Sequence, residues 1–275
     1  MIFQKTFHVQ GHRGARGLLP ENTIESCCRA VECGVAGLEI DIVVSKDGQI
    51  VVSHEPWMSA SMCSFPDGNA VNTEGVLLKN LTIAEIQQYD CGGRGNPRFP
   101  TQDKIKCYKP TLYELVLAVH TFCESKQLTR PFWNIEVKSH PKWYGRLVPP
   151  PPIFVRLLKK DLDNLGLLRD LSSFYISSFD LHILREMKKI TPSVHLAFLT
   201  ENRLSFEKNM RNLGFLPTFY SPYYKFLTTK TIEKAHKKGV KVVTWTVNDV
   251  KKADMLKRWQ LDGLITDFPN LLSSF

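Results

Sequence analysis

Three acidic residues lie within two short segments whose apolar and β-branched side chains predict buried strands. Glu39 and Asp41 are two positions apart in residues 37–44, and Glu136 lies in residues 132–137. Side chains alternate between the two faces of a strand, so Glu39 and Asp41 share one face. Carboxylates crowded on neighbouring strands repel one another unless a cation lies between them. An all-oxygen set suits Mg²⁺ or Ca²⁺ better than zinc, so the sequence predicts a divalent-cation site.

Two histidines follow strand-like segments in the same way. His12 follows the first predicted strand, and His54 follows the hairpin extension of the second. Imidazole exchanges a proton near neutral pH, so this pair can act as acid and base in phosphoester cleavage. Arg13 and Lys138 add the positive charge that phosphoryl oxygens need. The sequence has no G-x-S-x-G, P-loop or protein-kinase motif that would indicate another chemistry.

These residues belong to a chain in which short apolar segments alternate with longer segments of helical periodicity. The alternation is typical of a parallel sheet. The predicted strands are 6–11, 37–44 with its hairpin extension 49–53, 132–137, 174–177, 194–198, 219–220, 240–244 and 263–266. The main predicted helices are 22–33, 112–123, 153–165, 181–189, 204–213, 229–238 and 249–259.

About eight strand–helix units in one chain of this length predict a closed (β/α)8 TIM barrel. A doubly wound open sheet is the alternative, but the glycine-rich first turn that would favour it is missing. Active sites of such barrels lie at the carboxyl ends of the strands. The acids and the histidines occupy that end, so the fold would gather them into one site.

Two segments interrupt the alternation. Residues from about 55 to 110 are too long for a βα connection and are rich in turn-forming residues. They are predicted to form an insertion in a single domain of residues 1–275. Within it, Thr82 and Glu85 form a capping pattern for a short helix over 82–89. Residues 139–152 end in four prolines and are predicted to form an extended loop.

The composition is that of a folded protein with a sizeable core. The 275 residues are 43% hydrophobic and 23% charged, which excludes a disordered or collagen-like chain. No apolar run reaches the roughly 18–20 residues of a membrane-spanning helix. The net charge of +9 favours anionic partners such as phosphate esters. The basic residues are scattered and nucleic-acid-binding motifs are missing, so nucleic acid is not a predicted partner.

The cysteines show no pattern of a metal site. There are 7 of them, without a C-x-x-C pair or zinc-ligand spacing. Cys27, Cys28 and Cys33 fall in a predicted amphipathic helix, where a free thiol behaves as a small apolar group. Reduced thiols are therefore expected. The first ten residues lack the basic and apolar segments of a secretory leader, so a cytoplasmic location is predicted.

A series of short motifs runs along nearly the whole chain. They are Gly11–Gly14 (GHRG), Pro20–Thr23 (PENT), Glu39–Asp41 (EID), Lys46–Gly48 (KDG), Val52–His54 (VSH), Leu81–Ile86 (LTIAEI), Asn134–Lys138 (NIEVK), Ser177–Asp180 (SSFD), Trp245–Asn248 (WTVN) and Asp262–Pro269 (DGLITDFP). In content and order, this series resembles the glycerophosphodiester phosphodiesterase family. One departure is Glu55, because members commonly have aspartate directly after the second histidine.

The resemblance implies a (β/α)8 barrel with an insertion after its second strand. It implies hydrolysis of a small glycerophosphodiester, in which the glycerol 2-hydroxyl attacks phosphorus while one histidine takes its proton and the other protonates the leaving alcohol. Water then opens a cyclic phosphate to give sn-glycerol 3-phosphate. The implied roles are Glu39, Asp41 and Glu136 as ligands of Ca²⁺ or Mg²⁺, His12 and His54 in proton transfer, Arg13 and Lys138 at the phosphate, and Trp245 at the glycerol.

Two other functions are weighed against this one. A related barrel could act on lysophospholipids at a membrane surface, since the chain is basic and the loop with Lys142, Trp143 and Tyr144 is a candidate interfacial anchor. The alternative for this loop is that its aromatic rings pack against the barrel rim. A barrel that binds phosphodiesters without turnover is the third hypothesis, and it is disfavoured because every ionisable role is filled.

Overall fold

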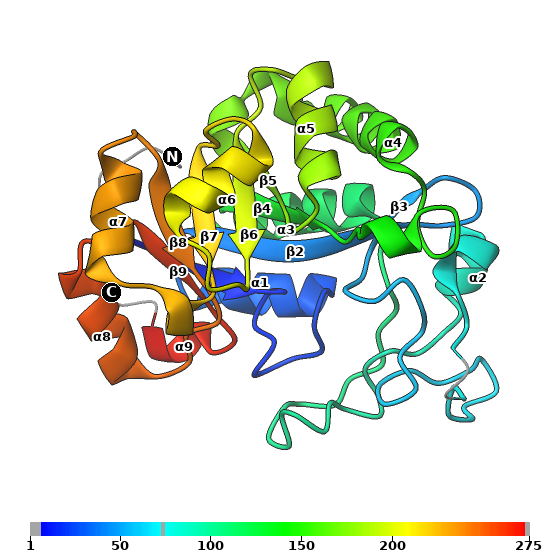
Figure 1. Ribbon diagram of the computed structural model, residues 1–275. Coiled ribbons are helices and arrows are strands. Elements are labelled where there is room, and N and C mark those ends of the chain that lie inside the picture. The colour runs from blue at the N-terminus through cyan, green and yellow to red at the C-terminus, as the bar shows by residue number, and fades with distance from the viewer. Residues whose placement is uncertain (1–6, 73–74, 273–275) are drawn as a thin grey trace.

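Eight parallel strands close into a barrel in the computed structural model, which describes residues 7–72 and 75–272 (Figure 1). These strands are β1 (His8–His12), β2 (Gly37–Val44), β4 (Phe132–Val137), β5 (Phe174–Ser178), β6 (Leu196–Thr200), β7 (Phe219–Pro222), β8 (Lys241–Thr244) and β9 (Gly263–Thr266). A further strand, β3 (Ile50–Val52), is antiparallel to β2. β1 pairs with both β2 and β9, and these pairings close the barrel. The predicted (β/α)8 fold is confirmed. Thr6, predicted as part of the first strand, lies outside the described residues.

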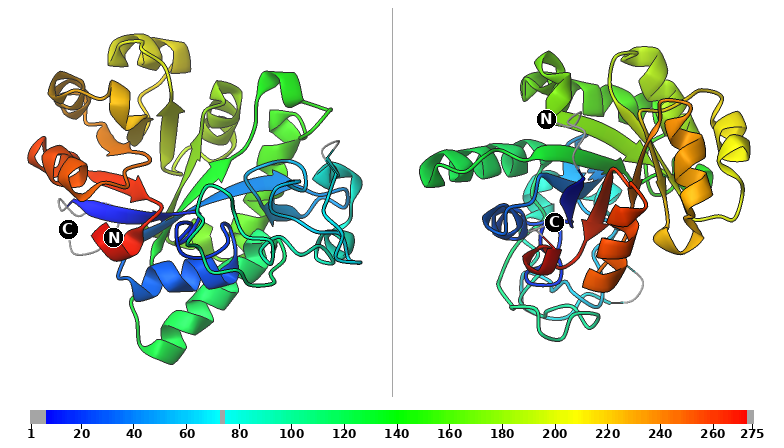
Figure 2. Two further views of the ribbon diagram at one scale, coloured as in Figure 1. Left: turned by 90° about the horizontal axis from the view of Figure 1, so that it is seen from below. Right: turned by 90° about the vertical axis from the view of Figure 1, so that its left-hand side faces the viewer.

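Helices surround the barrel on its outer side (Figure 2). They are α1 (Ile24–Glu32), α2 (Ile83–Ile86), α3 (Leu112–Lys126), α4 (Pro151–Asn164), α5 (Leu181–Ile190), α6 (Phe206–Leu213), α7 (Thr229–His236), α8 (Val250–Arg258) and α9 (Pro269–Leu272), with 3₁₀ turns at Leu78–Asn80, Pro141–Trp143, Leu167–Arg169, Leu171–Ser173 and Tyr224–Phe226. Side-chain caps fix where many of them begin. Thr23, for example, accepts from the backbone N–H of Ser26 at the start of α1. Among the described residues, none of the helices combines the length and apolarity needed to cross a membrane.

The apolar core has two parts, one outside the barrel wall and one inside it. The large outer part lies between the strands and the helices. The inner part is one layer of side chains formed by Phe132, Tyr175, Ala197, Phe219, Val243 and Ile265. The rings of Tyr175 and Phe219 have centroids 4.5 Å apart. This layer fills the interior, so polar side chains nearer the carboxyl ends of the strands form the floor of a cavity above it.

The predicted insertion lies beyond the carboxyl end of β2 (Figures 1 and 2). β3 pairs antiparallel with β2 as the predicted hairpin extension, with Ile42 opposite Val52. The insertion has its own small apolar cluster, which includes Met58, Val71, Leu78 and Ile86 and packs on β2 and β3. The Thr82–Glu85 capping box is present, although α2 is shorter than predicted. The insertion is therefore attached to the barrel by a shared apolar contact.

The prediction of seven reduced thiols is wrong for two cysteines of the insertion. Cys63 and Cys91 form a disulfide, although they are 28 positions apart in the chain. An antiparallel bridge between Ser64 and Asp90 brings them together, which no local spacing signal shows. The other five cysteines are free thiols. Disulfides are typical of oxidising compartments, so the cysteines no longer support a cytoplasmic location.

The proline-rich segment 139–152 is only partly the extended loop that was predicted. Pro151 and Pro152 form the first turn of α4, where a missing backbone N–H costs nothing. Trp143 and Tyr144 are half-buried against the core, and the Tyr144 hydroxyl donates to Asp180. The rings thus pack against the barrel rim, as the alternative to an interfacial anchor requires.

Replacing Phe219 by alanine tests the inner layer. The side chain is fully buried, so we expect the free energy of unfolding to fall by about 3–5 kcal/mol, the usual cost of a large cavity. Urea unfolding followed by circular dichroism measures this change. The matched control is Leu216→Ala, because Leu216 is 51% exposed. A loss for Phe219→Ala no larger than that of the control would contradict the packed interior.

Candidate active site

The three predicted acids meet at the carboxyl ends of β2 and β4. Parallel pairing places Asp41 directly opposite Glu136, and Glu39 is one pleat earlier on the same face of β2. One carboxylate oxygen from each residue lies within 4.8 Å of those of the other two. All three side chains are buried. The sequence prediction of a crowded acidic set therefore describes the observed geometry.

The charges of this set are incompletely balanced by the protein. The Oε1 atom of Glu39 and the Oδ1 atom of Asp41 are buried and accept no hydrogen bond. Burial raises the pKa of Glu39 well above its usual range, and the neighbouring charges of Asp41 and Glu136 raise it further. Buried carboxylate oxygens that accept no hydrogen bond are costly unless a cation approaches them closely. The donor set therefore fits a hard divalent ion.

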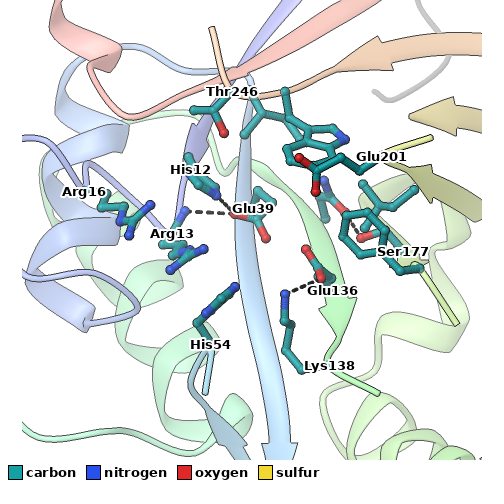
Figure 3. Close-up of a pocket in the computed structure, with 15 residues that line it drawn as sticks. His12, Arg13, Arg16, Glu39, His54, Glu136, Lys138, Ser177, Glu201 and Thr246 are labelled. Carbon is teal, nitrogen blue, oxygen red and sulfur yellow. Dashed lines mark hydrogen bonds and ion pairs between the residues drawn. The ribbon is translucent and has the colours of Figure 1, made fainter. Parts of the chain in front are cut away.

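Arg13 and Lys138 provide the positive charge next to these acids (Figure 3). The Lys138 ammonium lies 2.6 Å from Glu136 Oε1 and 3.6 Å from Asp41 Oδ1. Arg13 Nε is 3.0 Å from Asp41 Oδ2. Burial disfavours the Asp41 carboxylate, but the charges of Arg13 and Lys138 outweigh it and hold the pKa of Asp41 well below its usual range. Asp41 is therefore ionised, and both cations face the same cavity as the acids.

A tight turn after β1 positions Arg13. Its φ of 52° is in the left-handed region, which is unusual for a residue with a side chain. Its backbone N–H donates to Glu39 Oε2 at 3.0 Å, and its guanidinium donates to Glu21 at 2.6 Å. Asn22, predicted to begin the first helix, lies before the Thr23 cap and exchanges two hydrogen bonds with Asp41 instead. The GHRG and PENT segments thus build one scaffold around the acids.

Each of the two histidines has one ring nitrogen held by a carboxylate. His12 Nδ1 donates to Asp267 Oδ1 at 2.5 Å, and His54 Nδ1 donates to Glu55 Oε1 at 2.8 Å. Burial lowers the pKa of His12, although the hydrogen bond to Asp267 opposes this shift. The Nε2 atom of each ring is outside these two hydrogen bonds, and Nε2 of His12 lies 3.8 Å from Glu39.

Glu55 and Asp267, which each accept a hydrogen bond from a histidine ring, also have the same protonation state. Burial would raise the pKa of each carboxyl, but the hydrogen bond and charge of its histidine, together with nearby cations, outweigh burial and lower the pKa to about 2. Both are therefore carboxylates at neutral pH. Glu55, which stands where family members commonly have aspartate, reaches the ring of His54 directly. Sequence reasoning placed Asp267 at the end of the last strand but gave it no partner.

Trp245 lies at the rim of the same cavity, where the resemblance places it. Its indole N–H donates to the carbonyl of Ser221 at 2.9 Å. Its ring meets Phe179 edge-to-face, with centroids 5.4 Å apart and planes at 89°. This contact orients both rings at the carboxyl ends of β5 and β8.

The cavity above the barrel interior has a volume of about 360 Å³. It contains seven of the eight residues to which the resemblance gave roles, and Asp41 is buried just below them. Sequence reasoning missed several further lining residues, namely Arg16, Asn134, Ser177, Phe179, Leu199, Glu201, Thr246 and Ile265. Five of them, Ser177, Phe179, Leu199, Glu201 and Ile265, lie within one residue of the end of a strand, a position that gives a general signal but no specific role.

A hydrogen-bonded chain of side chains forms the floor of this cavity. Ser177 Oγ donates to Asn134 Oδ1 at 2.7 Å, and Asn134 Nδ2 donates to Gln10 Oε1 at 3.1 Å. The Tyr175 hydroxyl donates to the same Gln10 oxygen at 3.0 Å. All four side chains are buried. Their mutual hydrogen bonds satisfy these polar groups inside the barrel and hold the floor of the cavity in place.

With this geometry established, comparison with known proteins identifies the family. The model of the Glycerophosphoryl diester phosphodiesterase family matches residues 12–271. The chain belongs to this family. The resemblance seen in the sequence is thereby confirmed, and the chain is an enzyme that cleaves phosphodiesters of glycerol.

Several individual relatives align with this chain along nearly their whole lengths. The glycerophosphodiester phosphodiesterase from Caldanaerobacter subterraneus is 31% identical over 264 residues, which cover 96% of this chain and 95% of the relative. A solved structure of a putative family member from Silicibacter pomeroyi superposes with a TM-score of 0.85 at 26% identity, covering 97% of this chain and 91% of the other. An Oleispira antarctica phosphodiesterase, solved in complex with the product sn-glycerol-3-phosphate, has the same fold with a TM-score of 0.75 at 22% identity, covering 97% and 95%.

Replacing Asp267 by asparagine tests its ion pair with His12. The folded-state pKa of Asp267 is lowered from 3.8 to about 2, so the ionised group stabilises the fold above pH 4 and this stabilisation is lost as the pH falls from about 4 to about 2. The variant should unfold more easily at pH 7, by about 2 kcal/mol, and lose less stability over that acid interval. Chemical unfolding at several pH values measures both effects.

The matched control for this substitution is Asp254→Asn. Asp254 forms an exposed pair with Arg258 on α8, and such pairs contribute little. If the stability of Asp267→Asn falls between about pH 4 and about pH 2 as much as that of the wild type and of the control, the inferred ionic state of the His12–Asp267 pair is contradicted.

Proposed function

We propose that this enzyme hydrolyses glycerophosphodiesters to sn-glycerol 3-phosphate and an alcohol, with a divalent cation bound by Glu39, Asp41 and Glu136. The observation that carries the proposal is that two buried carboxylate oxygens, one on Glu39 and one on Asp41, accept no hydrogen bond. They lie in one site with two carboxylate-held histidines and two cations, the buried Arg13 and the half-buried Lys138. The product bound by the Oleispira phosphodiesterase supports the same assignment.

Residues of this chain would have the following roles in the reaction. Arg13 and Lys138 bind the phosphate oxygens and offset their charge. One histidine accepts the proton of the glycerol 2-hydroxyl through its Nε2 atom as that oxygen bonds to phosphorus. The other histidine donates a proton to the leaving alcohol as its P–O bond breaks. The roles reverse when water opens the cyclic phosphate, and both histidines return to their starting states.

The carboxylates beside the histidines make this exchange efficient. Asp267 and Glu55 each fix one ring nitrogen, so the second nitrogen of His12 and of His54 is the one that meets the substrate. A negative neighbour also stabilises the imidazolium that forms when a histidine takes up a proton. The ion, Ca²⁺ or Mg²⁺, would supply Lewis-acid stabilisation of charge on oxygen when bound. Trp245 would line the glycerol part of the site.

Release of glycerol 3-phosphate from glycerophosphocholine tests the proposal. The protein is first treated with a chelator and then given back Ca²⁺ or Mg²⁺. Chelation should abolish release, and at least one of the two ions should restore it. Failure of both ions to restore release, in a sample shown to be folded by circular dichroism, would contradict the proposed reaction.

The matched variants are His54→Ala and His140→Ala. Loss of an acid–base group lowers kcat by about 10²–10⁴-fold, so His54→Ala should show a fall in that range with every metal that supports the wild type. His140 is exposed and outside the cavity, so its replacement should leave kcat near that of the wild type. Near-native turnover by His54→Ala would remove this residue from the proton transfer.

A further inference from the structure

One acidic residue of the cavity takes no part in the proposed ion site or proton transfers. Glu201 follows the last residue of β6 and lines the cavity at its exposed edge. Figure 3 shows it on the side away from His54 and Lys138. Within residues 7–72 and 75–272, its carboxylate makes no hydrogen bond or ion pair. The cavity thus holds one negative charge that the protein leaves without a partner.

The neighbouring cations do not explain this charge, because each already has an acidic partner. Arg13 pairs with Asp41, Arg16 with Glu21, and Lys138 with Glu136. A phosphodiester brings a further negative charge into the cavity and is repelled by a free carboxylate. The repulsion becomes attraction when the substrate carries a positive group at its other end.

Two aromatic rings, those of Phe179 and Trp245, line the same cavity as Glu201. Phe179 directly follows β5, which pairs with β6, and it lines the cavity although 38% of its surface is exposed. Its ring lies edge-to-face with Trp245 and 5.9 Å from the Lys138 ammonium. Aromatic faces attract alkylammonium groups, and most strongly those with methyl substituents that also pack on the ring. A carboxylate with such rings is a recognition site for an amino alcohol.

We propose that Glu201, Phe179 and Trp245 form a subsite for the positively charged amino group of the leaving alcohol. The enzyme would then prefer diesters of amino alcohols, such as choline, over diesters of neutral alcohols. Trp245 would lie between the glycerol and the amino alcohol. This inference rests on the proposed function and specifies which alcohol leaves.

The test compares two substrates that differ only in charge. One is glycerophosphocholine, and the other carries a 3,3-dimethylbutyl group, in which carbon replaces the ammonium nitrogen. For Glu201→Gln, the ratio of kcat/KM for the charged over the neutral ester should fall by about 3- to 10-fold, the scale of a partly exposed charge contact. The neutral ester should be cleaved somewhat faster, because a repulsive charge has been removed.

Glu233→Gln is the matched control for net charge. Glu233 is an exposed residue of α7 outside the cavity, so its substitution should not change the ratio. An equal loss with both esters in Glu201→Gln would overturn the proposal, since it would indicate a hydrogen bond to the part they share. An unchanged ratio would overturn it too.

Binding measured without turnover separates this inference from the proposed reaction. In the His54→Ala background, titration calorimetry gives the Kd of each ester for the protein with and without the Glu201→Gln substitution. Selective weakening of the charged ester by Glu201→Gln supports the subsite even if neither ester is hydrolysed, and that lack of hydrolysis would count against the proposed function alone. Equal Kd values for the two esters in the His54→Ala protein would overturn the subsite.

Discussion

The repulsion among three buried carboxylates is the constraint on which the rest of the site depends. Glu39, Asp41 and Glu136 are brought together by the parallel register of β2 and β4, so the fold itself creates the crowding. Charges removed from water at such short separations are strongly destabilising without compensation. Arg13 and Lys138 supply part of that compensation, and the two carboxylate oxygens left without hydrogen bonds mark where more positive charge belongs.

Elements from different parts of the chain position the residues around this cluster. The turn after β1 bends Arg13 toward the acids, and closure of the barrel by β9 brings Asp267 to His12. The hairpin of β2 and β3 positions His54, whose ring donates a hydrogen bond to the adjacent Glu55. The two histidines therefore come from β1 and from the hairpin of the neighbouring β2, and each is held by a carboxylate. The rigid barrel wall holds these short contacts in place, which favours catalysis by preorganised charge.

The sequence was sufficient for the barrel and for the acids because both depend on strand periodicity. It could not pair residues that lie far apart in the chain: Asp267 with His12, or Cys63 with Cys91, depends on closure and on the path of the insertion. Proline content alone could not separate a loop from the first turn of α4, since proline is compatible with both. That Glu201 has no hydrogen bond or ion pair within residues 7–72 and 75–272 likewise depends on the three-dimensional arrangement and could not be predicted from the sequence.

The most direct test of this account is a calorimetric titration of the metal-free protein with Ca²⁺ and with Mg²⁺, for the wild type and Glu136→Gln. The substitution keeps the size of the side chain and removes one ligand charge. The account predicts saturable binding of one ion, weakened by about tenfold or more in the variant, with the fold retained by circular dichroism. Absence of binding by the wild type for both ions, or equal affinity in the two proteins, would contradict an ion held by the three carboxylates.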